Sequence, residues 1–269
     1  MIALSGEAFA QIVAKLRTAG CVFADEEARL LIASAASRSE LVAMLDRRTG
    51  GIPLEHVVGW VEFCGMRLRI EPGVFVPRRR SELLAHTATE LARENGRRPC
   101  VLLDLCCGNG AIGATIGSAF DSLELYAVDV ESAAVRCARE NLPQAHVYIG
   151  NLYEPLPAQL ERRVDVIVAN APYVPSNEIE LLPAEARLHE PLVALDGGHD
   201  GLDVTRKIAA GASRWLTADG HLLIETGAHQ APKTVEIFAS NGFQTDVVSS
   251  EEFGATVVVG STKKPAYGS

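Results

Sequence analysis

Residues Val164 to Tyr173 read VDVIVANAPY, and this stretch decides how the rest of the chain is interpreted. Its first half is apolar and rich in β-branched residues, which is typical of a strand buried on both faces inside a parallel sheet. Pro172 has no N–H group to donate, so the strand is expected to end before it. The sequence therefore predicts that Asn170 and Tyr173 lie just past the carboxyl end of a central strand, where open α/β sheets bind ligands.

The segment Asn170-Ala171-Pro172-Tyr173 contains the groups needed to hold a planar amino group. The Asn170 side chain and a backbone carbonyl can each accept one N–H, and the Tyr173 ring can cover the plane. Asn and Pro are also common in ordinary turns, so a turn without chemistry remains open from this segment alone. The other segments of the chain decide between the two interpretations.

Composition and charge are those of a globular protein. The 269 residues are 48% hydrophobic and 22% charged, and no apolar run reaches the roughly 20 residues that cross a bilayer. The N-terminus does not resemble a signal peptide, so the predicted location is the cytoplasm. The net charge of −9 argues against a broad nucleic-acid surface. None of the six cysteines forms a C-x-x-C pair, which predicts reduced thiols and no metal site.

The N-terminal part predicts a small bundle of three helices. Apolar residues recur at helical spacing up to Gly20, where the first helix is expected to end. Asp25 is expected to cap the second helix, and Thr49-Gly50-Gly51 to end the third. Such a bundle is more often a docking or recognition module than the place of catalysis, and a merely stabilising extension is the alternative.

A hairpin and a helix are expected to follow the bundle. Between Trp60 and Val76, apolar residues alternate on both sides of Glu71-Pro72-Gly73, which predicts two strands that turn at this point. The next apolar periodicity, from about Ser81 to Asn95, is helical. We therefore expect the hairpin to join the bundle to the main domain.

A glycine-rich turn between a strand and a helix indicates a cofactor site. The apolar strand Cys100–Leu105 runs into Cys106-Cys107-Gly108-Asn109-Gly110, whose backbone N–H groups can meet a ligand at a helix N-terminus. The next strand ends at Asp129, about 20 residues further on, where a carboxylate can hold two ribose hydroxyls. After another helix and strand, Asn151 and Leu152 can meet an adenine edge.

The residue pattern of this turn distinguishes between the possible cofactors. The dinucleotide fingerprint is G-x-G-x-x-G, whereas this chain has Asp104-x-Cys106-x-Gly108-x-Gly110, with an acid at the start. That form resembles the first motif of Rossmann-like methyltransferases, which bind S-adenosylmethionine. The chain has no G-K-[ST] sequence of a P-loop, so NTP hydrolysis is not expected.

Over nearly its whole length the chain resembles the release factor glutamine methyltransferases, also called protein-(glutamine) methyltransferases. The segments that carry the resemblance are PLEHVVGW (53–60), GVFVPR (73–78), DLCCGNGAIG (104–113), GNLYEPL (150–156), NAPYV (170–174) and EPLVALDGGHDGLD (190–203). The last segment is the most specific, since methyltransferases of other substrates lack it.

The resemblance implies an α/β fold with a Rossmann-like class I methyltransferase domain. Its sheet would have seven strands, mostly parallel, with the last strand antiparallel, and a small helical bundle and a β-hairpin would precede it. The expected division is 1–59 for a helical substrate-recognition domain, 60–79 for a hairpin linker and 80–269 for the methyltransferase domain.

The resemblance also implies roles for single positions. Cys106, Cys107, Gly108, Asn109 and Gly110 would hold the amino-acid moiety of S-adenosylmethionine. Asp129 would hold the ribose, and Asn151 and Leu152 the adenine, while Asp104 and Asn170 also belong to the cofactor-binding set. Asn170, Ala171, Pro172 and Tyr173 would hold the side-chain amide of a protein glutamine. The implied target is the Gly-Gly-Gln loop of a peptide chain release factor, with no membrane partner.

The chemistry explains these residue types. An amide nitrogen is a weak nucleophile because its lone pair is delocalised into the carbonyl. Acceptors on both of its N–H groups can hold it and favour a pyramidal nitrogen, and we expect these to be Asn170 Oδ1 and the Ala171 carbonyl. Catalysis would rest on positioning and electrostatics, with reacting atoms at about 3–3.5 Å and no dedicated general base.

Four departures from the family pattern indicate a divergent branch. The usual Asn-Pro-Pro-Tyr has Ala171 at its second position, and the usual Pro-Arg-Pro-x-Thr-Glu reads Pro-Arg-Arg-Arg-Ser-Glu over residues 77–82. Cys106 replaces a glycine, so this position is expected not to need a positive φ. Asn151 replaces an acid on the adenine side.

Three other functions stay open from the sequence. Asn-x-Pro-Tyr also suits methylation of an adenine exocyclic amine in a nucleic acid, although the acidic net charge argues against it. A non-catalytic S-adenosylmethionine-binding protein would not need Asn170 and Tyr173. A nicotinamide oxidoreductase is disfavoured by the missing third glycine.

Overall fold

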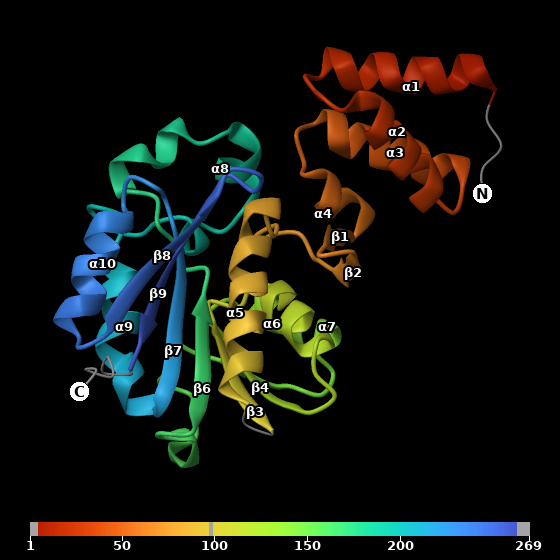
Figure 1. Cartoon of the computed structure of the whole chain (residues 1–269). Helices are drawn as coiled ribbons and strands as arrows, with labels where there is room; N and C mark the ends of the chain where they lie inside the picture. The colour runs from red at the N-terminus through yellow and green to blue at the C-terminus, as the bar shows by residue number, and fades with distance from the viewer. Residues whose placement is uncertain (1–4, 97–98, 263–269) are drawn as a thin grey trace.

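The computed structural model describes residues 5–96 and 99–262, which form a helical bundle, a two-stranded hairpin and an α/β domain (Figure 1). In the bundle, apolar side chains that include Leu16, Leu31 and Leu45 meet in one buried core. Asp25 does not cap the second helix as predicted, because that helix begins one residue earlier and Asp25 pairs with Arg17 instead. The helices are α1 (Gly6–Thr18), α2 (Ala24–Ser34), α3 (Arg38–Thr49) and α4 (Leu54–Val58).

The hairpin turns earlier than predicted. Its strands are β1 (Trp60–Phe63) and β2 (Met66–Arg69), joined at Cys64-Gly65 rather than at residues 71–73. Cys64 and Gly65 both have positive φ, +48° and +72°, as a tight two-residue hairpin turn requires. The Cys64 side chain hid this turn, since a cysteine at such a position is uncommon. Residues 71–74 make a separate turn beyond the hairpin.

The α/β domain contains a seven-stranded sheet in the order β5-β4-β3-β6-β7-β9-β8. All neighbouring pairs are parallel except those made by β9, which inserts antiparallel between β7 and β8. This confirms the predicted mostly parallel sheet with an antiparallel last strand. The strands are β3 (Cys100–Leu105), β4 (Leu123–Asp129), β5 (His146–Ile149), β6 (Val164–Ala169), β7 (Leu216–Thr226), β8 (Gln244–Ser250) and β9 (Ala255–Ser261).

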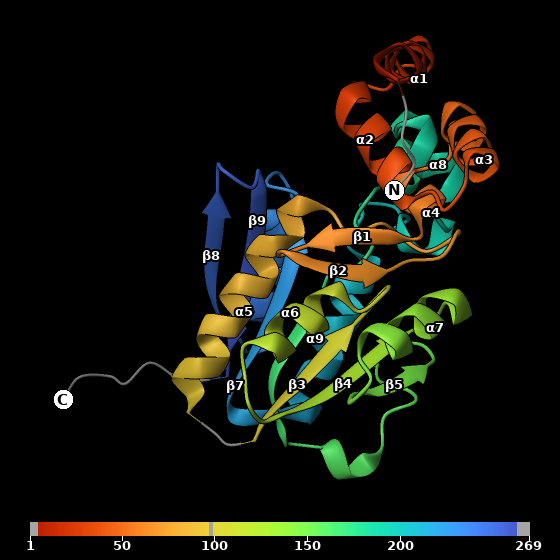
Figure 2. The ribbon, with the colours of Figure 1, turned by 90° about the vertical axis from the view of Figure 1, so that its right-hand side faces the viewer.

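Helices cover both faces of the sheet, as Figure 2 shows, because parallel strands are connected by crossover helices. One face packs on α5 (Glu82–Asn95), α6 (Ala111–Ser118) and α7 (Ser132–Asn141). The other packs on α9 (Asp203–Trp215) and α10 (Ala231–Ser240). A short helix, α8 (Ala184–His189), lies between β6 and α9 in the chain.

The strand order reverses beside β3. The chain proceeds from β3 outward to β4 and β5, and then returns to the other side of β3 with β6 and β7. The loops after β3 and β6 therefore leave the sheet in opposite directions and open a crevice between them. The helical bundle stands above this edge of the sheet (Figure 1).

Candidate functional site

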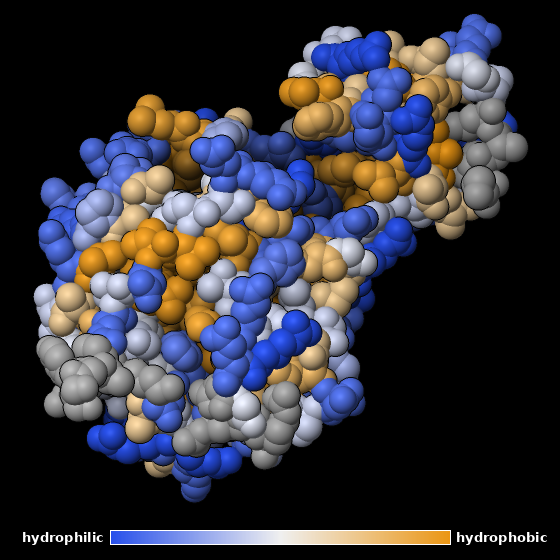
Figure 3. Space-filling model, in the orientation of Figure 1, coloured by the Kyte–Doolittle hydropathy of each residue, from blue (hydrophilic) through white to orange (hydrophobic). Residues whose placement is uncertain are grey.

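A cavity of about 700 Å³ opens where the strand order reverses, a size within the usual range for small-molecule sites. Figure 3 shows the molecule hollowed between the helical bundle and the α/β domain. The bundle contributes Phe23 and Arg48 to the wall, and the segment around α8 contributes Glu185 and Glu190. The predicted site residues on the wall are Cys106, Gly108, Asp129, Asn151, Leu152, Asn170, Ala171, Pro172 and Tyr173.

The glycine loop turns sharply from β3 into α6. Cys106, Gly108 and Gly110 all have positive φ, +54°, +56° and +83°. The expectation that Cys106 would not need a positive φ is therefore wrong. The loop imposes the left-handed conformation on this side chain, at a cost of roughly 1–2 kcal/mol relative to an ordinary backbone. A Cβ on Gly110 would lie 2.8 Å from the Leu142 side chain, so this glycine is also needed for packing.

Asp129 ties the glycine loop to the end of β4. Its Oδ2 accepts a hydrogen bond from the Gly108 N–H at 2.8 Å, and its Oδ1 accepts one from the Glu131 N–H at 2.9 Å. Burial raises the pKa of this carboxyl, and the two N–H groups partly offset that rise. Each carboxylate oxygen can accept a second donor, so two neighbouring ribose hydroxyls suit this group.

Four predicted cofactor residues, one at the end of β3 and three in the loop itself, do not line the cavity. Asp104 is fully buried, and its Oδ2 accepts from the Gly113 N–H at 3.0 Å. The Asn109 side chain donates to the Arg69 carbonyl at 3.1 Å, which fastens the loop to the hairpin. These positions therefore hold the shape of the loop. The four residues are Asp104, Cys107, Asn109 and Gly110.

The adenine side of the predicted site is formed after β5. Asn151 is exposed, and its side chain donates to Glu154 at 3.1 Å. Leu152 has a φ of +50°, and the next residue, Tyr153, stacks on Trp215 with ring centroids 5.8 Å apart. The packing of Tyr153 thus fixes the chain at the point where Leu152 reaches the cavity.

The segment Asn170–Tyr173, predicted to hold the target amide and called the acceptor segment below, begins where β6 ends, as the sequence indicated. The strand stops at Ala169, and the Asn170 side chain donates its Nδ2 to the Ser81 hydroxyl at 3.0 Å. The Arg80 guanidinium lies 5.5 Å from the centre of the Tyr173 ring. A cation beside the ring and an anchored amide leave the segment little freedom.

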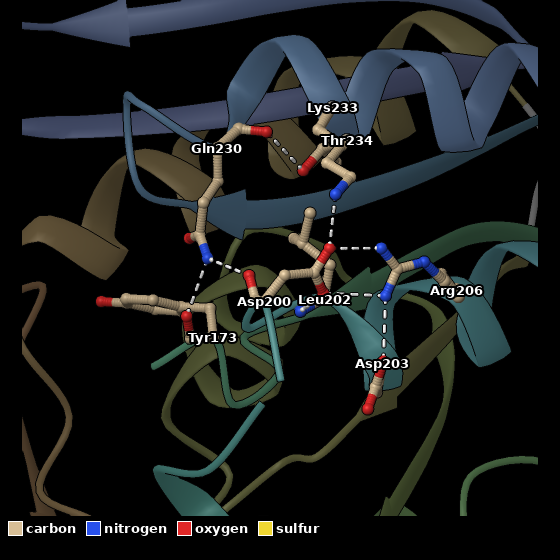
Figure 4. A network of polar contacts seen from close by, with 8 residues as sticks. All are labelled: Tyr173, Asp200, Leu202, Asp203, Arg206, Gln230, Lys233 and Thr234. Atoms are coloured by element: carbon tan, nitrogen blue, oxygen red, sulfur yellow. Dashed lines mark hydrogen bonds and ion pairs between the residues drawn. The ribbon is translucent and has the colours of Figure 1, made fainter. Parts of the chain in front are cut away.

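A polar network, which the sequence did not reveal, holds the Tyr173 backbone (Figure 4). The Gln230 amide, at the start of α10, donates to the Tyr173 carbonyl at 2.9 Å and to the Asp200 carbonyl at 3.2 Å. The Asp200 carboxylate in turn binds Arg206 and Lys233, each at 2.6 Å. These contacts hold the segment 190–203 beside the Tyr173 backbone.

The same segment supplies a buried acid. Glu190 Oε1 accepts from Arg78 Nη2 at 2.6 Å and from the Val76 N–H at 3.2 Å. Burial raises the pKa of this carboxyl and the Arg78 charge lowers it. Glu190 therefore fastens residues 76–78, at the entrance to α5, to the cavity wall.

Neither a metal-binding cluster nor a membrane-spanning helix is found in the part of the chain that the structure describes. No group of three or more His, Cys, Asp or Glu side chains in it is arranged to hold a metal ion. No helix within residues 5–96 and 99–262 is long and apolar enough to cross a membrane.

Known proteins are similar to this chain in sequence and in fold. The family model of the methyltransferase small domain matches residues 65–198. A release factor glutamine methyltransferase of Gloeobacter violaceus is 39% identical, over 76% of this chain and 72% of that protein. One of Mycolicibacterium smegmatis is 34% identical, over 93% of this chain and 89% of that protein. The solved structure of a ribosomal protein L11 methylase from Lactobacillus delbrueckii is 18% identical, with a TM-score of 0.52 over 73% of this chain and 86% of that one.

The fold, the glycine loop and the acid at the end of β4 define a class I methyltransferase that uses S-adenosylmethionine. The cavity fits this cofactor, since its wall combines a carboxylate for the ribose with a glycine turn open to approach. The two relatives refine the class, because each is more than 30% identical over more than two thirds of its own length. The chain belongs to the release factor glutamine methyltransferase family.

Proposed function

We propose that this enzyme acts in the cytoplasm and methylates the side-chain amide nitrogen of a glutamine in a peptide chain release factor. One observation carries the proposal: the segment Asn170–Tyr173 lines the same cavity as Asp129 and the glycine loop. A cofactor held by Asp129 and a target amide held by Asn170 would therefore share one enclosed space. The names of the relatives point to the same target.

When bound, S-adenosylmethionine supplies a methyl group on a sulfonium. The chain's own residues would position the nitrogen that receives it. Asn170 Oδ1 and the Ala171 carbonyl would each accept one N–H of the target amide, and the Tyr173 ring would cover its plane. Ala171 is buried, so its carbonyl keeps a fixed place. These contacts would bring the nitrogen to reacting distance, the contribution for which enclosed sites are suited.

The rim of the cavity suits a protein substrate. Large apolar side chains stand exposed on both sides of it: Phe23 is 68% exposed in the bundle, and Val193 is 45% exposed beyond α8. Exposed apolar groups around a site are typical of protein contact surfaces. We therefore propose that residues 1–59 recognise the substrate, while residues 80–269 hold the catalytic groups and 60–79 link the two.

The test is methyl transfer from labelled S-adenosylmethionine to a release factor with a Gly-Gly-Gln loop, beside its Gln→Ala variant. We expect label on the intact loop only, and a loss of about a hundredfold with Asn170→Ala enzyme. Asn241→Ala is the matched control, since the Asn241 side chain donates to the Ile237 carbonyl at the end of α10 and the residue does not line the cavity. No label on the intact factor, with cofactor binding shown by calorimetry, would overturn the release-factor proposal and favour another acceptor, such as adenine.

A further inference from the structure

The orientation of the Asn170 side chain is decided by its neighbours. An Asn amide carries an acceptor on one end and two donors on the other, and only the acceptor suits the N–H of a target amide. The Nδ2 end donates to Ser81 Oγ at 3.0 Å. A serine hydroxyl alone does not impose this orientation, because it can donate as well as accept. A second group must accept the hydrogen of the Ser81 hydroxyl, so that its oxygen can only accept from Asn170.

Glu225 is placed to do this. Ala169 of β6 pairs with Ile224 of β7 in parallel register, so Asn170 and Glu225 are level at the ends of adjacent strands. Glu225 is only 2% exposed, and its Oε1 accepts from Arg80 Nε at 3.2 Å. Its Oε2 is buried without a hydrogen bond of standard geometry among the described residues.

Ser81 follows Arg80 directly in the chain, and its hydroxyl is the one that Asn170 binds level with Glu225, so Ser81 lies beside this carboxyl. Burial raises the pKa of the Glu225 carboxyl, and Ser81 and Arg80 offset part of that rise. Arg80 and Ser81 are consecutive at the turn that opens α5, and α5 runs beside β6 and β7 (Figure 1). One turn of chain thus brings both a cation and a hydroxyl to Glu225.

We propose that Ser81 and Glu225 are positioning residues, which together fix the Asn170 amide with Oδ1 turned toward the acceptor. A carboxylate only accepts hydrogen bonds, so Ser81 donates its hydrogen to Glu225. The Ser81 oxygen then accepts from Asn170 Nδ2, and Oδ1 is left to face the cavity. Arg80 binds Oε1 of Glu225, and its positive charge favours the carboxylate form. The inference rests on the proposed function in one respect, since it takes Asn170 Oδ1 as an acceptor for the target.

The arrangement predicts an unusual effect of Glu225→Gln. Arg80 needs an acceptor, so the new amide turns its oxygen to Arg80 and its NH₂ to Ser81. Ser81 would then donate to Asn170 Oδ1, and Asn170 would present Nδ2 to the target N–H. Removing the hydroxyl with Ser81→Ala only frees the Asn170 amide, which can still adopt the productive orientation part of the time.

Steady-state kinetics measure this difference. We expect kcat to fall about tenfold for Ser81→Ala and about a hundredfold for Glu225→Gln, with cofactor affinity unchanged by calorimetry. Ser81→Thr keeps a hydroxyl and should restore kcat. In the double variant Ser81→Ala with Glu225→Gln, kcat should match that of Ser81→Ala alone. The hydroxyl through which Glu225→Gln would turn the Asn170 amide around is absent in this variant. Additive losses would mean two independent structural effects and would overturn the proposal.

A second readout does not depend on methyl transfer. The side-chain NH₂ signals of Asn170 in NMR spectra, assigned by their loss in Asn170→Asp, should exchange with water about tenfold faster in Ser81→Ala than in the wild type. Glu161→Gln is the control, since Glu161 pairs with Arg214 on the surface. Equal exchange rates would overturn the inference whether or not the release factor is methylated. Protected signals in an enzyme that does not methylate the factor would instead count against the proposed function alone.

Discussion

Gln230 donates its side-chain amide to the carbonyl of Tyr173 at 2.9 Å, across 57 positions of sequence. The same nitrogen binds the Asp200 carbonyl, so one side chain joins the acceptor segment to the segment 190–203 (Figure 4). A Cβ on Gly201 would lie 2.3 Å from the Tyr173 carbonyl oxygen, which shows how closely the two segments approach. The position of the Tyr173 ring is therefore set from outside its own loop.

Replacing Gln230 should loosen the acceptor segment. Gln230→Ala leaves two partly buried carbonyls without their donor, and we expect a loss of about 1–3 kcal/mol in the free energy of unfolding. We also expect kcat to fall about tenfold with cofactor affinity retained, since the Tyr173 segment would shift. Urea unfolding and calorimetry measure the two effects. Lys233→Ala is the control, because its exposed pair with Asp200 is worth less than about 1 kcal/mol. Equal kinetic effects of both variants would contradict the assignment.

The left-handed Cys106 gives a second prediction. Cys106→Gly should leave the free energy of unfolding within about 0.5 kcal/mol of the wild type. Relief of strain, roughly 1–2 kcal/mol, is offset by the greater flexibility of glycine, about 0.5–1 kcal/mol, and by lost packing. Cys106→Val adds a β-branched side chain at φ +54° and should cost about 2 kcal/mol more than Cys106→Gly. Thermal unfolding of the two variants tests this order, and a valine variant as stable as the glycine variant would refute it.

Asp104 gives a pH dependence. Burial raises the pKa of its carboxyl to about 7, from 3.8 in an unfolded chain, and the Asp129 charge adds to the rise. The folded state therefore binds the proton more tightly, so stability falls as the pH rises from about 4 to about 7 and then levels off. The loss is on the order of 4 kcal/mol, since one pKa unit is about 1.4 kcal/mol.

Asp104→Asn should remove this slope, because an amide oxygen can still accept from the Gly113 N–H without ionising. The measurement is the free energy of unfolding of both proteins between about pH 4 and pH 8. All other titrating groups are shared, so the difference between the two curves isolates Asp104. Parallel curves would show that Asp104 does not titrate in this range.

Arg48 joins the bundle to the segment around α8. Its guanidinium binds Glu27 at 2.6 Å inside the bundle and Glu185 at 3.1 Å in α8. The Glu27 pair is about nine-tenths buried, so Arg48→Met should cost about 3–5 kcal/mol by leaving Glu27 unpaired. Glu185→Gln should cost less than about 1 kcal/mol, since that carboxylate is partly exposed. Chemical unfolding measures both, and equal costs would mean that the two contacts are equally buried.

The sheet was predictable because its signals are local. The runs CVLLDL and VDVIVA are β3 and β6 in the structure, buried at every position, as their apolar composition indicated. The hairpin turn was misplaced because Pro72 and Gly73 suggested a turn more strongly than Cys64 did. The strands were predicted correctly because neighbouring residues set their conformation. The hairpin turn was not, because the stronger turn signal in the sequence lay a few residues away from it.

The candidate site was predictable only in part, for the same reason. Asp129 is the last residue of β4, and Asn170 and Tyr173 come just after β6, so strand prediction located them. Gln230, Ser81 and Glu225 act through partners that are distant in sequence, and helix or strand periodicity contains no sign of those partners. One signal was available: HLLIE, residues 221–225, ends an apolar run with an acid, which is costly to bury without a partner.

The insertion of β9 between β7 and β8 determines when the acceptor side is completed during synthesis. Glu225 of β7 pairs with Val257 of β9, so the strand that holds it has no outer neighbour until residue 261 has been made. The loop of the cofactor side and its partner Asp129, by contrast, are complete by residue 142. A ribosome-bound chain that has exposed only its first 250 residues would thus have a formed cofactor loop, while β7, which holds Glu225, would still lack its outer neighbour β9. We therefore expect the enzyme to become competent only after β9 has been translated.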